Sequence, residues 1–318
     1  MKAAVYANPG PPSVLTYVDM PDPVCGPDDV LIEVEAISIE GGDLINRRST
    51  PQASPWVVGY AAAGTIVAIG DTVSGRAVGQ RVTAFDMHGS HAELWSVPAS
   101  RTWRVPDGLG MAEAAALPIS FATAHHCLIT KGGLRQAETV VVQAAAGGVG
   151  LAAVQIAHAE GARVIAIAGG RERQARLMEL GASHVIDRLQ EDVVEEVLRL
   201  TGGKGADLVI DPVGSTLQAS LSALAPEGRL VFVGNAGGGG LTVDLWQAMQ
   251  NNQTLHGVFM GTLFERPDVS GTVDALLAAA RDKRLTVVID RTFSLCDAAE
   301  AHDHAETAKP LGRVVMIP

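Results

Sequence analysis

The sequence has few cysteines and no long hydrophobic run, and these shortages exclude several classes of protein. Cys25, Cys127 and Cys296 lie far apart in 318 residues, so they form neither a disulfide framework nor a CxxC metal pair. No run approaches the roughly 18 apolar residues of a transmembrane helix. Prolines and a glycine at 8–12 interrupt the first apolar run, which argues against a signal peptide. We therefore expect a reduced, cytoplasmic protein with no membrane partner.

Basic residues are also scarce relative to acidic ones. The chain has 24 Lys and Arg against 35 Asp and Glu, and its formal net charge is −11. Such a charge disfavours nucleic acid and anionic membrane surfaces as partners. The hydrophobic fraction of 47% supplies sizeable cores in a chain long enough for about two domains. The composition favours a two-domain enzyme.

The most informative stretch of the sequence runs from Val140 to Ile156. A β-branched run predicts a buried strand, glycines and alanines follow it, and apolar residues then recur at helical spacing. Within this strand, turn and helix, the spacing Ala145-x-Gly147-x-x-Gly150 is typical of a dinucleotide-binding turn. Backbone N–H groups and the helix N-terminus would bind the pyrophosphate, so the expected contacts are Gly147, Gly148, Val149 and Gly150. A plain tight turn is the alternative interpretation.

The chain divides by pattern near Leu117-Pro118. Residues 1 to about 118 predict a mostly β domain, with strands at 3–6, 30–36, 64–69, 81–85 and 94–97. Beyond it, strands are expected at 139–143, 162–168, 184–187, 206–211, 229–234 and 254–259, with helices between them, as at 172–180 and 216–224. Six strands with helical crossovers predict an α/β fold with a doubly wound parallel sheet. Helices at 273–281 and 298–307 and strands within 285–293 and 313–317 follow, and periodicity leaves open which domain they join.

The end of the second predicted strand indicates which dinucleotide binds. An NAD site would place an acidic residue here to bind the ribose 2′-hydroxyl, but the sequence has Gly169-Gly170. These small residues leave room for a 2′-phosphate, which Arg171 and Arg173 could neutralise. Arg188, after the third strand, is a further candidate. We therefore expect NADPH as the cofactor; the alternative is that Arg171 and Arg173 are ordinary solvated charges at a helix start.

More cofactor contacts are expected where later strands end, because open α/β sheets bind ligands at that edge. The candidates are Thr123, Val213, Gly234, Asn235, Phe259 and Met260. The alternatives are turn formation for Asn235 and core packing for Phe259.

Several motifs together resemble the medium-chain dehydrogenase/reductase superfamily, in particular its zinc-free quinone oxidoreductase (zeta-crystallin-like) branch. They include Gly-Tyr-Ala-Ala-Ala-Gly at 59–64, Gly-Ser-His-Ala-Glu at 89–93, and the segments 123–124, 144–150, 181–182, 201–207 and 311–315. The resemblance covers nearly the whole chain. It implies a GroES-like β domain of 1–120 and 262–318, a Rossmann domain of 121–261, and an active site between them. It also implies a homodimer joined through the edge strand at 254–260.

The departures from that family concern the catalytic centre. Zinc-dependent relatives have Gly-His-Glu where this chain has Gly59-Tyr60-Ala61, and a cysteine near Glu40, so the resemblance implies no metal site. Quinone oxidoreductase relatives usually carry Asn at the position of Glu40. Glu40 therefore has a different partner, or its loop is rearranged. Tyr60 and Glu40 are the candidate catalytic residues, although Tyr60 could simply pack; His88 and His91 are expected to be structural.

We expect an NADPH-dependent, zinc-independent reductase that transfers hydride to a quinone or to the activated C=C of an α,β-unsaturated carbonyl. Its partner would be a small electrophile: a quinone, an enone or an alkenal. One alternative is an enoyl-thioester reductase. Another, from a different class, is a non-catalytic NADPH-binding protein with a crystallin-like or regulatory role.

Overall fold

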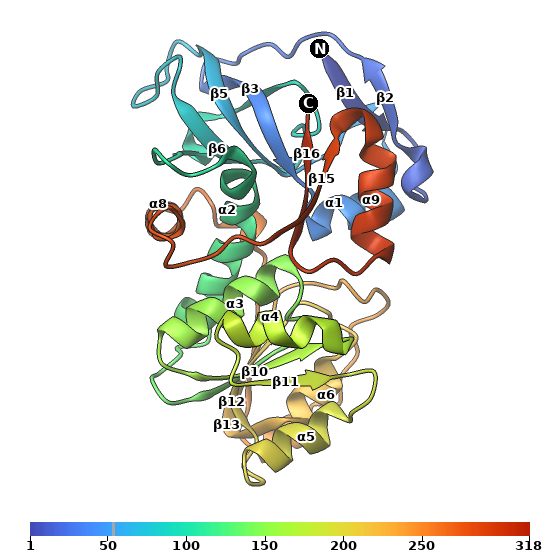
Figure 1. The fold of residues 1–318 in the computed structure, drawn as a ribbon, viewed down its shortest axis with the longest axis vertical. Coiled ribbons are helices and arrows are strands. Elements are labelled where there is room, and N and C mark those ends of the chain that lie inside the picture. The colour runs from blue at the N-terminus through green and yellow to red at the C-terminus, as the bar shows by residue number, and fades with distance from the viewer. Residues whose placement is uncertain (53–54) are drawn as a thin grey trace. The chain divides into compact units, whose positions relative to one another are not determined.

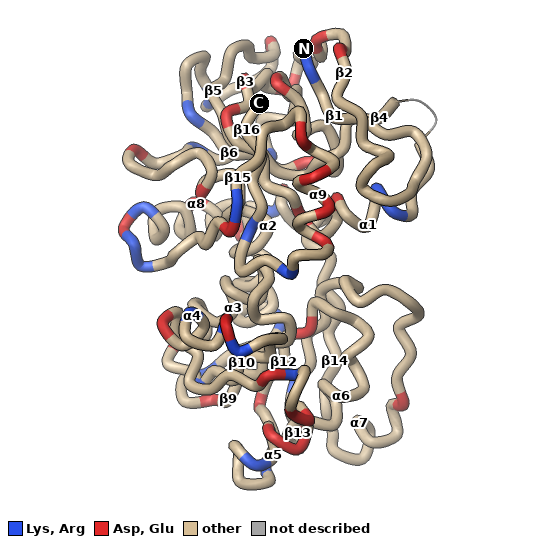
Figure 2. The backbone as a smooth tube through the Cα atoms, turned by 45° about the vertical axis from the view of Figure 1, so that its right-hand side comes forward, with Lys and Arg blue, Asp and Glu red and all other residues tan. Residues whose placement is uncertain are grey.

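The computed structural model of the chain describes residues 1–52 and 55–318. The chain forms two compact units (Figure 1). The first consists of Met1–Ile119 and Gly261–Pro318, and the second of Ser120–Met260. Both signs of charge are interspersed along each unit, as Figure 2 shows, so the net charge of −11 is distributed along the chain.

The second unit is built on a six-stranded parallel sheet of order β11-β10-β9-β12-β13-β14. The strands are β9 Thr139–Val142, β10 Arg163–Ala168, β11 His184–Asp187, β12 Ala206–Asp211, β13 Leu224–Phe232 and β14 Thr254–Gly257. The central strands are runs of Val, Ile and Ala without solvent exposure, as a sheet covered on both faces requires. The expected α/β fold class is confirmed.

Helices cover both faces of this sheet. They are α2 Met111–His125, which begins in the first unit, α3 Gly148–Ala159, α4 Gln174–Glu179, α5 Val193–Leu200, α6 Leu217–Ser222 and α7 Trp246–Gln250, with the π-helix η3 His126–Lys131 and the short 3-10 helix η4 Arg171–Arg173. Figure 1 shows α3 and α4 on one face and α5 and α6 on the other. The strand order reverses at β9, which pairs with both β10 and β12. The turn after β9 therefore lies at the topological switch point, where such sheets bind ligands.

The first unit is mainly β-structure. Its seven-stranded sheet has the order β15-β16-β3-β5-β6-β8 with β7 added to β3, and a smaller sheet has the order β2-β1-β4. The strands are β1 Lys2–Tyr6, β2 Thr16–Asp19, β3 Asp29–Ser38, β4 Trp56–Val57, β5 Ala61–Ile69, β6 Arg81–Phe85, β7 Leu94–Pro98, β8 Thr102–Arg104, β15 Ile289–Ser294 and β16 Arg313–Ile317. The helices are α1 Gly41–Ser49, α8 Pro267–Arg281 and α9 Ala298–Thr307, with short turns at η1 Pro12–Val14, η2 Ala99–Arg101, η5 Met260–Thr262 and η6 Leu295–Asp297. Because β16 pairs with β3, the C-terminal tail returns to this unit.

Several elements differ from their predicted bounds: β13 is Leu224–Phe232 rather than 229–234, and α8 begins at Pro267 rather than at 273. Two further ends have a direct physical reason. The helix expected at 216–224 ends at Ser222, because Leu224 pairs with Ala206 and begins β13. The strand expected at 254–259 ends at Gly257, opposite Phe232, where its partner strand also ends. Tertiary pairing overrides local pattern in both places. Within the described residues no helix has the length and apolar character needed to cross a membrane.

Candidate functional site

The glycine turn after β9 is fixed to the strands on both sides of it. The Gln143 N–H donates to the carbonyl of Ile210 at 2.9 Å, and the Ala145 N–H to that of Ile167 at 2.8 Å. Gly147 is the N-cap residue of α3, which begins at Gly148. The structure thus brings the four expected pyrophosphate contacts into one turn at the switch point.

Gly147 and Gly150 differ in what they do for the fold. A Cβ on Gly150 would lie 2.3 Å from the Ala144 carbonyl oxygen and 2.6 Å from the Ala145 Cα, so close packing of helix on turn requires glycine there. A Cβ on Gly147 would meet only that same oxygen, at 3.4 Å, which is ordinary contact. Gly147 is exposed, with extended φ and ψ of −81° and 171°. Packing would therefore allow a side chain at Gly147. Because glycine has none, the N-terminus of α3 stays open to an anion.

Basic groups gather where β10 ends. A Cβ on Gly169 would lie 3.5 Å from an Nη of Arg188, which comes from the loop after β11. Arg173 donates to the Gly169 carbonyl and pairs with Glu172 at 2.7 Å. Arg171 is exposed. Glu172, which follows β10, is therefore paired with an arginine, and Arg171 and Arg188 are further basic residues at this edge of the sheet.

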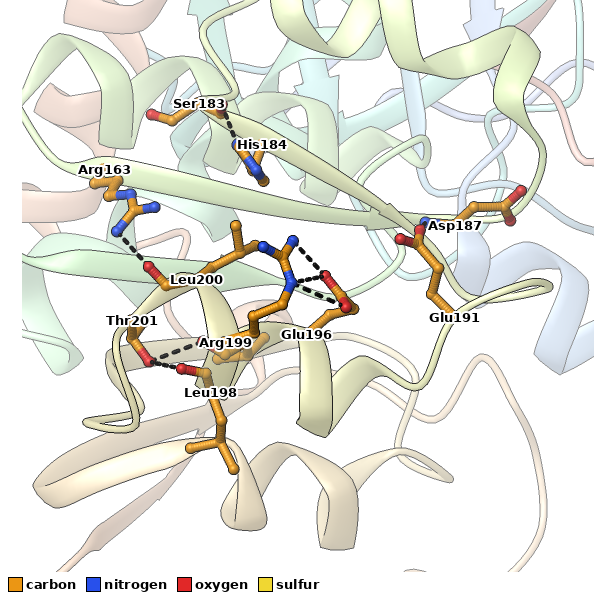
Figure 3. Close-up of polar contacts among 11 residues, drawn as sticks. Arg163, Ser183, His184, Asp187, Glu191, Glu196, Leu198, Arg199, Leu200 and Thr201 are labelled. Atoms are coloured by element: carbon orange, nitrogen blue, oxygen red, sulfur yellow. Dashed lines mark hydrogen bonds and ion pairs between the residues drawn. The ribbon is translucent and has the colours of Figure 1, made fainter.

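Asp187 organises the same edge from β11. Its Oδ1 accepts from the Gly170 N–H at 3.0 Å and the Leu189 N–H at 3.1 Å. These bonds hold the pKa of the Asp187 carboxyl below its usual value. Figure 3 shows Asp187 beside Glu191, whose carboxylate accepts from the Asp187 N–H at 2.8 Å. The loops after β10 and β11 are thus tied together.

Figure 3 also shows the opposite end of β11, marked by Ser183 and His184. Arg163 donates to the Leu200 carbonyl at 2.9 Å, and Arg199 pairs with Glu196 at 2.7 Å. These arginines support α5 and its C-terminus, in contrast to the group at the end of β10.

The loop after β12 depends on Asp211, which sequence reasoning missed. This fully buried carboxylate accepts from the Val213 N–H at 2.8 Å and from the hydroxyls of Thr216 and Ser220, both at 2.7 Å. The available signal was an acidic residue closing an apolar strand. The Val213 carbonyl in turn accepts from the Gly237 N–H at 2.9 Å, which joins this loop to the loop after β13.

The remaining cofactor candidates have varied surroundings. The Asn235 amide donates to the Gly239 carbonyl at 2.9 Å, as the turn-forming alternative expects. Gly234 is exposed and Met260 is buried. Phe259 is 63% exposed, so its core-packing alternative is wrong. Thr123 is buried in α2, apart in sequence from these loops.

In the first unit, Glu40 has the different partner that the sequence left open. It is the N-cap residue of α1, and its Oε1 lies 2.5 Å from an Nη of Arg313 on β16 and accepts from the Ser38 hydroxyl at 2.8 Å. Burial raises the pKa of the Glu40 carboxyl, and Arg313 opposes that shift. Arg313 was not among the expected site residues, because most of the chain separates it from Glu40.

Asp43 completes the start of α1. The Glu40 N–H donates to its Oδ2 at 2.7 Å, in a reciprocal cap. Asp43 has no solvent exposure, and burial raises the pKa of its carboxyl well above 3.8. Burial thus raises the pKa of both carboxyls, and the positive charge of Arg313 opposes the shift in each.

Tyr60 packs along α1. A Cβ on Gly42 would lie 2.2 Å from the Tyr60 ring, so the ring rests on the backbone of that glycine. Its hydroxyl oxygen accepts from the Asn46 amide at 2.7 Å, and its ring meets Phe85 edge-on at 6.2 Å between centroids. Burial raises the pKa of Tyr60 to about 12. The phenol is therefore protonated at neutral pH and available as a hydrogen-bond donor.

His88 and His91, which the sequence predicts to be structural, both pack against other rings of the first unit. His91 is fully buried, with its Nε2 3.0 Å from the Nε2 of His302, and burial lowers its pKa to about 3. His88 packs its ring on Trp56, with centroids 4.5 Å apart. In residues 1–52 and 55–318, no three His, Cys, Asp or Glu side chains form a group able to hold a metal ion.

Comparison with known proteins identifies the family. Residues 26–159 match the alcohol dehydrogenase GroES-like domain, and residues 148–279 match the zinc-binding dehydrogenase domain. A quinone oxidoreductase of Pseudomonas aeruginosa is 32% identical over 323 residues, covering 100% of this chain and 99% of that protein. The crystal structure of an Escherichia coli quinone oxidoreductase complexed with NADPH has a TM-score of 0.95 at 27% identity, covering 100% of both chains. A mycobacterial structure, also complexed with NADPH, has a TM-score of 0.94 at 33% identity with the same coverage.

The fold and the glycine turn thus define an oxidoreductase with a GroES-like unit and a dinucleotide-binding unit, the architecture of the medium-chain dehydrogenases/reductases. Within that superfamily, the chain belongs to the quinone oxidoreductase family. Although one matching domain is described as zinc-binding, the residues at 40 and 60 do not fit zinc, since the Glu40 carboxylate is paired with Arg313 and Tyr60 is a protonated phenol bound to Asn46.

Proposed function

We propose that the protein is an NADPH-dependent reductase that transfers hydride to a quinone or to the activated C=C of an α,β-unsaturated carbonyl. The observation that carries the proposal is the open glycine turn at the switch point, with arginines where β10 ends. Family membership supports it, because relatives of this fold are described as quinone oxidoreductases and as NADPH complexes. The acceptor is proposed to be a quinone, an enone or an alkenal.

In this proposal, the second unit holds the cofactor. The N–H groups of 147–150 bind the pyrophosphate, and Arg171, Arg173 and Arg188 bind the 2′-phosphate, whose charge they neutralise. Thr123 lies beside the nicotinamide. Further cofactor contacts come from Val213, Gly234, Asn235, Phe259 and Met260. When bound, NADPH supplies the hydride, and the protein orients the reactants.

The first unit serves the acceptor. As negative charge develops on the acceptor oxygen, the Tyr60 hydroxyl donates a hydrogen bond to it. With a pKa of about 12, this phenol is a better hydrogen-bond donor than proton source. The assignment of Glu40 as a catalytic residue stays a prediction, and its contacts with Arg313 and Ser38 favour a role in positioning α1.

The alternative enoyl-thioester reductase has less support. A basic patch that binds the phosphate of a thioester carrier would support this alternative, and Arg47 and Arg48 are the residues that could form it. Arg47 is fully buried and pairs with Glu306 at 2.5 Å, and Arg48 lies 3.4 Å from the same carboxylate.

We also propose that the protein forms a homodimer through the edge strand at 254–260. β14 is the last strand of its sheet, and large apolar side chains near it are exposed: Leu245, Trp246, Met249 and Phe259. Three free thiols fit a reducing compartment, which we propose to be the cytoplasm.

The test is NADPH oxidation measured against a panel of quinones, enones, alkenals and enoyl-thioesters. We expect turnover with quinones or enones and a preference for NADPH over NADH. The Gly147→Asp variant, which places a carboxylate beside the pyrophosphate position, should lose this activity. Gly271→Asp is the matched control, because a Cβ on that α8 glycine meets nothing within 4 Å.

Other outcomes contradict the proposal in different ways. Turnover with thioesters alone would support the enoyl-thioester alternative. Tight NADPH binding without turnover on any acceptor would support a non-catalytic NADPH-binding protein.

A further inference from the structure

We propose that Asn46 is a positioning residue that directs the Tyr60 hydroxyl proton toward the acceptor. The proposal rests on the proposed function, in which Tyr60 donates a hydrogen bond to the acceptor oxygen. Asn46 lies one helical turn after Gly42 on α1, and its amide nitrogen is 2.7 Å from the Tyr60 hydroxyl oxygen.

The contacts of Tyr60 fix its ring and its main chain, so the hydroxyl hydrogen is the part that can still rotate. The ring rests on the backbone of Gly42 on one side and meets the edge of Phe85. The Tyr60 carbonyl accepts from the Asp86 N–H at 3.0 Å, which fixes the main chain. A ring held in this way can still rotate its O–H bond, and the neighbours of the oxygen decide where the proton points.

Asn46 decides that direction through hydrogen-bond chemistry. A phenol oxygen has one proton to donate and lone pairs to accept with. Because the Asn46 N–H donates to a lone pair, the proton of Tyr60 is not used in this bond and remains available to a ligand. A carboxylate at position 46 would do the reverse, because it could only accept, and would take the proton from the acceptor.

The backbone of Asn46 is held in place. Its main-chain carbonyl accepts from the Tyr6 hydroxyl at 3.1 Å and from the Thr50 N–H at 2.9 Å, so α1 is anchored at this residue. The bond from Asn46 also lowers the pKa of Tyr60, against the larger effect of burial. The hydrogen bond from Asn46 therefore leaves the Tyr60 proton free for the acceptor and also makes the phenol slightly more acidic.

The test is a double-mutant cycle with Asn46→Asp and Tyr60→Phe, using an enone as acceptor. We expect Asn46→Asp to lower kcat about tenfold, the value of one hydrogen bond, with the KM for NADPH unchanged. In the Tyr60→Phe background it should have no further effect. Asn252→Asp, on an exposed residue of the second unit, is the control for the added charge. An effect of Asn46→Asp that is equal in both backgrounds would overturn the proposal.

A measurement without substrate protects the test against a variant that folds poorly. The chain has three tyrosines, so 3-fluorotyrosine gives three 19F signals that Tyr→Phe variants can assign. Asn46→Leu should raise the pKa of fluorinated Tyr60 by about half to one unit and leave Tyr6 and Tyr17 unchanged. An unchanged Tyr60 would overturn the proposed bond.

The experiments distinguish a failure of the proposed function from a failure of the role of Asn46. Absence of turnover with every acceptor would overturn the proposed function, and with it any acceptor role for Tyr60. An additive cycle in an active enzyme would overturn only the role of Asn46.

Discussion

The glycine turn after β9 and the start of α1 are the two regions on which the proposed chemistry depends, and they are built differently. The turn is made from consecutive residues, and backbone hydrogen bonds to Ile167 and Ile210 fix it. The start of α1 is made from side chains distant in sequence, with Glu40 held by Arg313 and Tyr60 by Asn46. The cofactor side therefore depends on glycines, which have no side chain, whereas the acceptor side depends on buried charge and hydrogen bonds.

The largest expected effect comes from breaking the buried ion pair. Arg313→Met leaves the Glu40 carboxylate, only 4% exposed, without its cation. Removing one partner of a buried pair costs about 3–5 kcal/mol. We expect this loss in urea unfolding, and a large recovery in the double variant Glu40→Leu/Arg313→Met. A single variant as stable as the wild type would show that the pair does not hold α1.

The next effect tests the turn itself. Gly150→Ala forces a Cβ to within 2.3 Å of a backbone oxygen and should cost about 1–3 kcal/mol of unfolding free energy, as overpacking does. Gly147→Ala is the matched control, because its Cβ has room at 3.4 Å; it should change stability by less than about 0.5 kcal/mol while weakening NADPH binding. Equal losses of stability in thermal unfolding would contradict the distinction between packing glycine and ligand glycine.

A smaller effect is expected on the acceptor side. Tyr60→Phe removes the proposed donor and should lower kcat for an enone about tenfold, without altering NADPH affinity. Since the Tyr60 pKa is about 12, the Tyr60-dependent part of the rate should stay constant from pH 6 to about pH 10. Steady-state rates of both proteins across this range measure it. Unaltered turnover in the variant would remove the donor role.

A last effect is expected on the pH dependence of stability. Burial raises the pKa of Asp43 well above 3.8, so the folded state binds this proton more tightly than the unfolded chain. The corresponding stability is fully present below pH 3.8 and is lost as pH rises through the folded pKa. Asp43→Asn should remove that decline, with a slope of at most about 1.4 kcal/mol per pH unit.

Urea unfolding at pH 4, 5, 6, 7 and 8 measures this slope. Exposed Asp71→Asn serves as the control for the loss of a carboxylate. Parallel curves for the wild type and Asp43→Asn would show that Asp43 is not protonated preferentially in the fold.

Much of the second unit could be predicted from sequence, because its signals are local. The β-branched run, the glycine turn and the helical spacing at 140–156 are consecutive, and the sheet follows from repeating such units. Local pattern fails at Leu224, where pairing with Ala206 converts an expected helix end into a strand. It also missed the buried carboxylate of Asp211, because a strand-closing acid does not reveal which loop it will hold.

The acceptor side could be predicted only in part. The sequence shows that Glu40 and Tyr60 stand where metal ligands are expected in zinc-dependent relatives. It does not show which residues contact Glu40 and Tyr60. Arg313 reaches Glu40 only because β16 pairs with β3, and Asn46 reaches Tyr60 only because Gly42 admits the ring. Contacts of this kind depend on tertiary geometry, which residue spacing does not encode.

The most direct test of the central claim is a fluorescence titration of the purified protein with NADPH and with NADH, repeated on Arg171→Ala/Arg173→Ala. Hydrogen bonds to a charged group contribute about 1.5–3 kcal/mol. The account predicts that the wild type binds NADPH at least tenfold more tightly than NADH. It also predicts that the double variant loses this preference while its NADH affinity stays the same. Equal affinities for the two dinucleotides in the wild type, or an unchanged preference in the variant, would contradict it.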